Sequence, residues 1–79
     1  DISEQKSTEE LEEQLVNLLH HLPKVQREIV QMRIFHDLSF KEIAESEKIS
    51  INTALGRMRY ALINLRKLLE ENEIVTHFA

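Results

Sequence analysis

Four basic side chains in the second half of the chain have the clearest chemical potential. Arg57, Arg59, Arg66 and Lys67 lie in a stretch that contains no proline and has helical spacing. Long basic side chains can reach phosphate groups, and a guanidinium group can bind the O6 and N7 atoms of one guanine together. These residue types indicate contact with a nucleic acid, and Arg59 is the best candidate for a base contact.

The charge is unevenly distributed, although the whole chain has a formal net charge of −4. Residues 1–19 contain six acidic residues and one lysine, residues 20–69 contain nine basic and five acidic residues, and the last ten residues contain three glutamates. A locally positive surface attracts a polyanion whatever the net charge of the chain. A basic middle between acidic ends is consistent with nucleic-acid binding; the alternative is that these charges belong to ordinary solvated faces.

The histidines and carboxylates predict neither a metal site nor a catalytic centre. His20 and His21 are adjacent and point about 100° apart on a helix, while His36 lies near a turn and His77 near the end of the chain. Cysteine is absent, so there is no thiol nucleophile and no thiolate ligand. No nucleophile lies beside a plausible base. We therefore expect no metal, no cofactor and no enzymatic activity.

Length and composition indicate one small helical domain. The chain has 79 residues with one glycine and one proline, which disfavours an all-β fold with its many tight turns. No apolar run approaches the roughly 18–20 residues needed to span a bilayer, and no signal peptide opens the chain. A cytoplasmic domain over residues 7–71 is predicted, with the end of an interdomain linker at 1–6 and a tail at 72–79.

The first half of the chain is predicted to form two helices. A capping box, Ser7-Thr8-Glu9-Glu10, begins the first helix. Its apolar stripe consists of Leu11, Leu15, Leu18, Leu19 and Leu22. Pro23 suits the first position of the second helix. The apolar stripe of the second helix consists of Val25, Ile29, Met32 and Phe35, widened by Val30 and Ile34.

The second half predicts a helix-turn-helix. Ser39-Phe40-Lys41-Glu42 is a second capping box that begins a short helix. That helix must end before Ile49, because Ser50 has the position of another cap. From Ile51 a long helix can continue to about Glu71. In such a unit the second helix is the one that enters a DNA major groove.

A rotation of 100° per residue sorts the long helix into two faces. The predicted core face contains Ile51, Ala54, Leu55, Met58, Ala61, Leu62, Leu65, Leu68 and Leu69. The opposite face contains Asn52, Thr53, Gly56, Arg59, Tyr60, Ile63 and Lys67, with Arg57 and Arg66 at the flanks. A mid-helix glycine costs about 1 kcal/mol relative to alanine. Three explanations of Gly56 stay open. It allows close approach to a duplex, it allows tight packing on a neighbouring helix, or it arose by neutral evolutionary drift.

The predicted fold class is therefore all-α, with four helices of which the last two form the helix-turn-helix and pack on the first two. The predicted core contains Leu15, Leu19, Leu22, Ile29, Val30, Ile43, Ala44, Ile49, Ala54, Met58, Ala61 and Leu65.

A string of residues between 22 and 69 carries a family resemblance. It comprises Leu22-Pro23, Arg27-Glu28-Ile29-Val30, Met32-Arg33, Leu38-Ser39-Phe40-Lys41-Glu42-Ile43-Ala44-Glu45, Ile49-Ser50, Thr53, Arg57-Met58, Ala61-Leu62 and Leu65-Arg66-Lys67-Leu68. In this order the string resembles region four of bacterial sigma factors, a winged-helix-like promoter-reading domain, and within them the extracytoplasmic-function group. The resemblance implies an excised C-terminal piece that recognises the upstream, minus thirty-five promoter element.

The resemblance also implies partners: promoter DNA, the flap of the RNA polymerase β subunit and, in many members, an anti-sigma factor. It further implies a nucleoid-associated protein that directs RNA polymerase core to promoters. Val25, Ile29 and Met32 are expected to include the docking site for the flap, because the stripe widened by Val30 and Ile34 is broader than a small bundle needs to bury.

Two sets of DNA-binding residues follow from the predicted faces and the resemblance together. The residues expected to face the major groove are Asn52, Gly56, Arg59 and Tyr60. The residues expected to bind phosphates are Lys41, Arg57, Arg66 and Lys67.

The sequence departs from the family pattern at two turns and on the DNA-facing side. Asp37 and Lys48 stand where members often have glycine, and lysine tolerates a left-handed backbone poorly. The turn at Lys48 is therefore expected to be strained or differently shaped. Leu55 and Gly56 replace residues that are usually polar or charged.

Two other functions stay open from the residues alone. One is a protein-interaction module whose apolar groove binds a partner helix. The other is the helix-turn-helix output domain of a response regulator, which lacks the Leu22-Pro23 opening and usually dimerises through its last helix. The Leu-Pro start and Arg66-Lys67 favour the sigma-factor interpretation.

Overall fold

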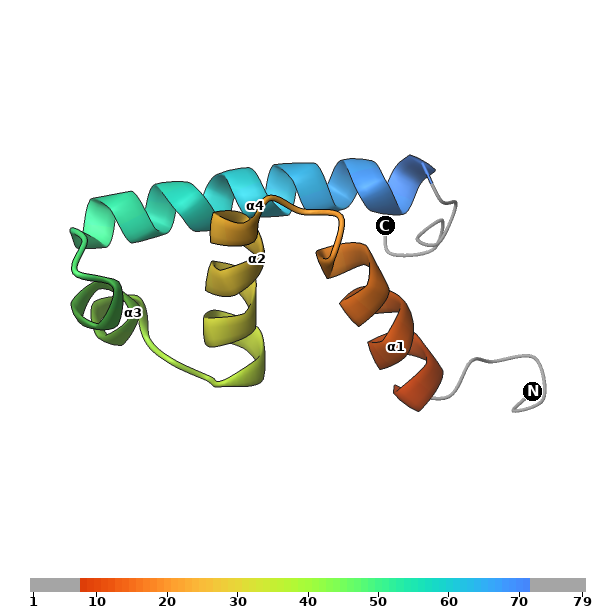
Figure 1. Cartoon of the computed structure of the whole chain (residues 1–79), viewed down its shortest axis with the longest axis horizontal. Helices are drawn as coiled ribbons and strands as arrows, with labels where there is room; N and C mark the ends of the chain where they lie inside the picture. Colours follow the sequence, from red (N-terminus) through yellow and green to blue (C-terminus); the bar gives the residue numbers. More distant parts are fainter. Residues whose placement is uncertain (1–7, 72–79) are drawn as a thin grey trace.

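The computed structural model describes residues 8–71, and within that range every regular element is a helix. The helices are α1 (Thr8–Leu19), α2 (Lys24–Val30), α3 (Phe40–Glu47) and α4 (Ile51–Glu71) (Figure 1). A π-helical segment, η2 (Gln31–Phe35), continues α2 directly. The all-α, four-helix prediction is confirmed. The predicted linker, the Ser7 cap, the tail and His77 lie outside the described residues.

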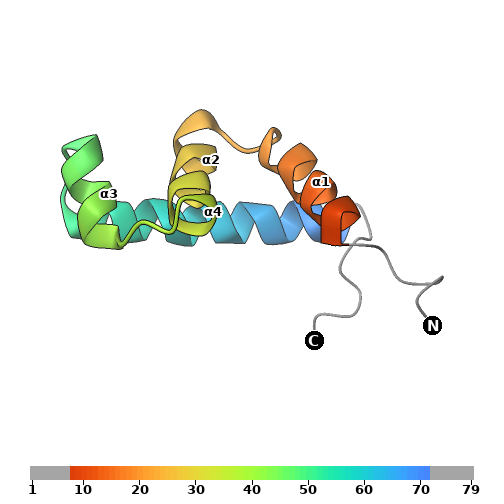
Figure 2. The same ribbon diagram turned by 90° about the horizontal axis from the view of Figure 1, so that it is seen from below.

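The long helix α4 is the element against which the three shorter helices pack. Figures 1 and 2 show the three shorter helices along one side of it: α3 at its N-terminal end, α2 across its middle and α1 toward its C-terminal end. All three contact α4. The other side of α4 carries no helix of the described chain. One side of α4 is therefore committed to the core, while the other is uncovered by the rest of residues 8–71.

The core lies between α4 and the three short helices. The side chains with at most 1% exposure on the short helices are Leu19, Ile29, Val30 and Ile43, and α4 contributes Ala54, Met58, Ala61 and Leu65. Leu22 and Ala44 are also buried, as predicted. Leu15 and Ile49 are half-buried and pack against this cluster. Leu18, absent from the predicted core, is 5% exposed and belongs to it.

The predicted core face of α4 was too wide. Ile51, Leu55 and Leu62 are 46%, 44% and 47% exposed, so their assignment to the core is wrong. These three lie on one flank of the helix, since they are four and seven residues apart. The short helices cover only one side of α4 (Figure 2), and the flank lies beyond their reach.

The predicted apolar stripe of the second helix is only partly buried, as its breadth led us to expect. Val25, Ile34 and Phe35 are 45%, 50% and 44% exposed. Beyond Val30 the chain is π-helical, and the wider π turn rotates each later side chain away from the position that 100° per residue predicts. Pro23 precedes the helix as its cap rather than opening it, and its carbonyl accepts the Arg27 N–H at 2.9 Å.

Helix α1 packs by its last turn. Leu18 and Leu19 are buried, whereas Leu11, at the start of the apolar stripe, is 45% exposed. The N-terminal part of α1 leads away from α4 in Figure 1.

Candidate nucleic-acid interface

The start of α3 is fixed by the capping box that the sequence predicts. The backbone N–H of Glu42 donates to Ser39 Oγ at 3.0 Å, and the backbone N–H of Ser39 donates to Glu42 Oε1 at 2.8 Å. The backbone hydrogen bond from Ser39, helped by the Ser39 side chain, lowers the pKa of the Glu42 carboxyl below its ordinary value. The carboxylate form thus stabilises the first turn of α3.

The turn between α3 and α4 depends on a left-handed residue. Lys48 has φ 56° and ψ 46°. The Lys48 N–H donates to Glu45 O at 3.4 Å and the Ile49 N–H donates to Ala44 O at 3.0 Å, which is the hydrogen-bond pattern of a Schellman motif. Ile49 packs against the core. Lys48 thus holds a left-handed conformation that favours glycine and that carries a steric cost for lysine.

Ser50 caps α4 as predicted. The Thr53 N–H donates to Ser50 Oγ at 3.0 Å, and the Ser50 hydroxyl donates to Thr53 Oγ1 at 2.9 Å. The first turn of α4 therefore starts at a defined residue, and the side chains that follow it have fixed directions.

The turn that precedes α3 is held by one arginine. Asp37 has φ 54°, and the Arg33 guanidinium lies 3.7 Å from its carboxylate. The same guanidinium donates to Leu38 O at 3.3 Å and lies 5.5 Å from the centre of the Phe40 ring. Arg33 thus joins η2 to the first residue of α3, and it is committed to the fold rather than to a ligand.

A polar contact joins α2 to the middle of α4. Asn64 Nδ2 donates to Gln26 Oε1 at 2.7 Å in a half-buried position. Together with Ile29 and Val30 in the core, this bond sets the angle at which α2 crosses α4 (Figure 1).

The residues predicted to face the major groove lie on the uncovered side of α4. Asn52 and Arg59 are exposed, Tyr60 is 62% exposed, and Gly56 is half-buried. A Cβ atom built on Gly56 would meet nothing within 4 Å. Tight packing on a neighbouring helix within the described chain is therefore not the reason for this glycine.

The residues predicted to bind phosphates lie on α3 and α4. Lys41 is exposed in the first turn of α3, and Lys67 is exposed on α4. Arg57 is half-buried. Arg66 is exposed and lies 3.6 Å from Glu70. From Ile51 to Leu69 the sequence of α4 contains four basic residues and no acidic one, so nothing on this stretch of helix repels a polyanion.

The three residues predicted to dock the polymerase do not share one surface. Val25 is 45% exposed and Met32 is half-buried, but Ile29 is 1% exposed. Ile29 belongs to the core, so Val25 and Met32 are the accessible members of this set, and their role in docking stays a prediction.

The helical rotation placed two apolar residues of the uncovered side of α4 in the core, although the family pattern already put Leu55 on the DNA-facing side. Ile51 and Leu55 lie in its first two turns beside Asn52, yet both had been placed in the core. A signal was available: both lie at the margin of the predicted core face, next to polar neighbours in the helical rotation.

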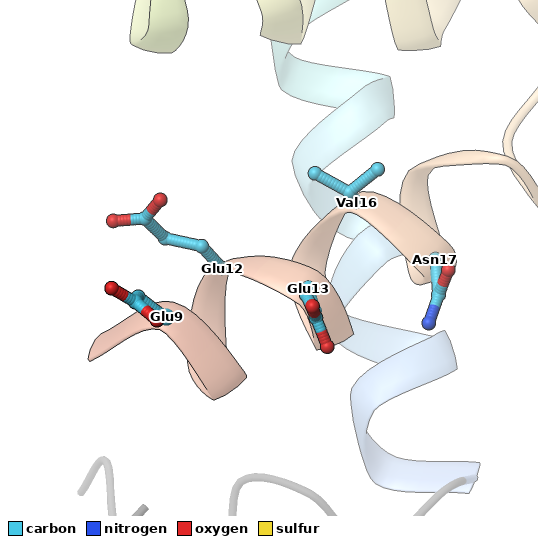
Figure 3. A pocket seen from close by; sticks show the side chains of 5 residues that line it. All are labelled: Glu9, Glu12, Glu13, Val16 and Asn17. Carbon is cyan, nitrogen blue, oxygen red and sulfur yellow. The ribbon is translucent and has the colours of Figure 1, made fainter. Parts of the chain in front are cut away.

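The side chains that line a hollow on α1 do not converge on one point. Glu9, Glu12, Glu13, Val16 and Asn17 line a hollow on α1. Figure 3 shows Glu12 and Val16 pointing to one side of α1, and Glu13 and Asn17 pointing to the other. Among residues 8–71, no three histidine, aspartate or glutamate side chains group so that they could hold a metal ion. Nor is any helix of this range both long and apolar enough to cross a membrane.

Comparison with known proteins gives one finding. A family model described as "Sigma-70, region 4" matches residues 12–62. The matched segment includes the last two turns of α1, all of α2 and α3, and the part of α4 that carries the predicted major-groove residues. Searches of curated proteins and of solved structures returned no match.

Proposed function

Because the chain belongs to the sigma-70 region 4 family, a promoter-recognition domain of sigma factors, we propose that it recognises the upstream, minus thirty-five element of a promoter. The observation that carries the proposal is the uncovered side of α4. It begins at a capped turn, contains Asn52 and Arg59, and has no acidic residue before Glu70.

The architecture supports entry of α4 into the major groove. In a helix-turn-helix the N-terminal residues of the second helix contact base edges. Arg59 is assigned to a guanine, and Asn52 has the amide that suits an adenine. Tyr60 and Gly56 complete the base-facing set, Gly56 because its open space lets the backbone approach the duplex.

Phosphate contacts are assigned to Lys41, Arg57, Arg66 and Lys67. Arg66 must exchange Glu70 for a phosphate, and the cost is small because both side chains are well exposed, at 84% and 70%. These contacts supply affinity without sequence information.

The finer assignments rest on the resemblance of residues 22–69. They place the parent protein in the extracytoplasmic-function group, in the cytoplasm at the nucleoid, with an anti-sigma factor as a regulatory partner. The flap of the RNA polymerase β subunit is assigned to the surface around Val25 and Met32, with Ile29 supporting that surface from the core.

The test compares two arginines of α4 in RNA polymerase holoenzyme that carries the full sigma factor. Arg59→Ala is expected to cost about 1–3 kcal/mol of promoter affinity and to relax specificity at one base pair. Arg66→Ala, the matched control, is expected to weaken binding to all duplexes alike and to reduce the salt slope by roughly one. Competition binding to a promoter and to a duplex with a scrambled upstream element, across a salt series, measures both effects.

A wild-type holoenzyme that binds both duplexes equally would contradict the proposed function. An Arg59→Ala variant that keeps the wild-type ratio of promoter to scrambled affinity would refute the assignment of Arg59 alone.

A further inference from the structure

The first two turns of α4 expose two large apolar side chains where a DNA-binding helix usually presents polar ones. Leu55 is 44% exposed and Ile51 is 46% exposed. They are four residues apart, so the two side chains are neighbours on one flank of the helix. Neither belongs to the core, and neither is far from the residues assigned to bases.

Leu55 lies between two of those residues. It follows Asn52 by three positions and precedes Arg59 by four, which are the spacings of neighbouring side chains on a helix surface. The next residue, Gly56, adds no side chain, and the space that a Cβ would occupy there is open. A duplex whose bases both Asn52 and Arg59 contact therefore comes close to Leu55, which is a neighbour of both residues on the flank of this surface.

The edges of the base pairs in the major groove present one apolar group, the C5-methyl of thymine. A leucine side chain offers no hydrogen bond, so it gains free energy in the groove by excluding water from that methyl group. We propose that Leu55, supported by Ile51, contacts the C5-methyl of a thymine and so determines specificity at that base pair. This inference rests on the proposed function, because it requires α4 in the major groove.

The same helix provides an internal control. Leu62 has the same residue type, is 47% exposed, and follows Leu55 by seven residues on the same flank. Seven residues correspond to about 10 Å along the helix axis. Leu62 lies C-terminal to every residue assigned to a base, and only Arg59 among them is its neighbour at a spacing of three or four residues. Truncation of Leu62 removes the same apolar volume without removing the proposed contact.

The experiment removes one thymine methyl group of the DNA at a time. Holoenzyme that carries the full sigma factor selects upstream elements from a randomised duplex pool, and each thymine of the selected element is then replaced by deoxyuridine. Binding of the wild-type, Leu55→Ala and Leu62→Ala holoenzymes to each duplex is measured by competition.

For wild type, one deoxyuridine substitution is expected to weaken binding about fourfold, the effect of burying one methyl group. The Leu55→Ala holoenzyme should lose that penalty at the same position, whereas the Leu62→Ala holoenzyme should retain it. A penalty caused by altered duplex stiffness would persist in Leu55→Ala, so the variant separates direct contact from DNA shape.

The inference is overturned if no deoxyuridine position affects wild type, or if Leu55→Ala retains the full penalty. It is also overturned if Leu62→Ala abolishes the penalty to the same extent. Each of these outcomes leaves the proposed function standing as long as the wild-type holoenzyme prefers the selected element over a scrambled one. Loss of that preference would instead contradict the proposed function.

Discussion

Two turns flank α3, and each contains a non-glycine residue in the left-handed region: Asp37 (φ 54°) before the helix and Lys48 (φ 56°) after it. Each turn is closed by a backbone hydrogen bond from the following residue. The Ile49 N–H reaches back five residues to Ala44 O, and the Leu38 N–H reaches back six residues to Met32 O, both at 3.0 Å. The hydrogen bond at the first turn thus spans one residue more than the bond at the second turn, which is consistent with the wider helical turn of η2.

The side chains at the two turns differ more than the backbones do. At the first turn, Arg33 contacts Asp37, Leu38 and Phe40, so a side-chain clamp links η2 to α3. At the second turn, the hydrogen bonds around Lys48 are backbone bonds. The same local conformation is thus stabilised by two means. The second turn sets the direction of α4, the helix assigned to DNA. Its left-handed residue, Lys48, is less suited to that conformation than Asp37 is.

Of the changes around the two turns, loss of the Ser39 cap after the first turn is expected to have the largest effect on the free energy of unfolding. Ser39→Ala removes the hydroxyl that accepts the Glu42 N–H and should reduce the free energy of unfolding by about 1 kcal/mol. Ser46→Ala, at an exposed serine in the last turn of α3, is the matched control and should have little effect or stabilise slightly. Urea denaturation of the variants measures the difference. Equal effects at both serines would mean that the cap contributes nothing to α3.

The next effect compares the two left-handed residues directly. Lys48→Gly should raise the free energy of unfolding by ~0.5–1 kcal/mol, because glycine adopts φ 56° without the steric cost that lysine bears. Asp37→Gly should gain less, since aspartate tolerates this conformation better and its contact with Arg33 is lost. Thermal denaturation of both variants ranks them. A larger gain at Asp37 would reverse our account of which turn is strained.

The smallest effect is a pH dependence at the capping box. The pKa of Glu42 is lowered in the folded protein, so its ionised form stabilises the fold above its ordinary pKa of 4.5, and this contribution is lost as the pH falls through the folded pKa. Glu42→Gln keeps an acceptor for the Ser39 N–H but does not titrate. The stability advantage of wild type over Glu42→Gln should therefore shrink on acidification from pH 7 toward pH 3. A difference that stays constant with pH would contradict the role of the carboxylate.

Much of the fold could be predicted from local signals. The capping box at Ser39, the cap at Ser50 and the course of α4 from Ile51 to Glu71 are all confirmed. These features depend on contacts within four residues, so the sequence alone specifies them. The buried residues of α4 lie at positions 54, 58, 61 and 65, because helical periodicity places them at the centre of one face.

The margins of the helix faces were decided by the tertiary structure. Periodicity gives the direction of each side chain but not the width of the surface that covers it. Three short helices cover one side of α4, which leaves Ile51, Leu55 and Leu62 exposed. The π turn rotates Ile34 and Phe35 out of the predicted stripe. The crossing of α2 over α4 buries Ile29, which removes it from any docking surface.

The sequence by itself thus determined where α3 and α4 begin and end, because caps, turns and periodicity are short-range. Only the tertiary structure decided which of the remaining side chains are free. Burial depends on which helices pack together, and that follows from contacts between residues far apart in the chain. Near the start of α4, Leu55 had been assigned to the core, but the structure exposes it as a neighbour of Asn52 and Arg59.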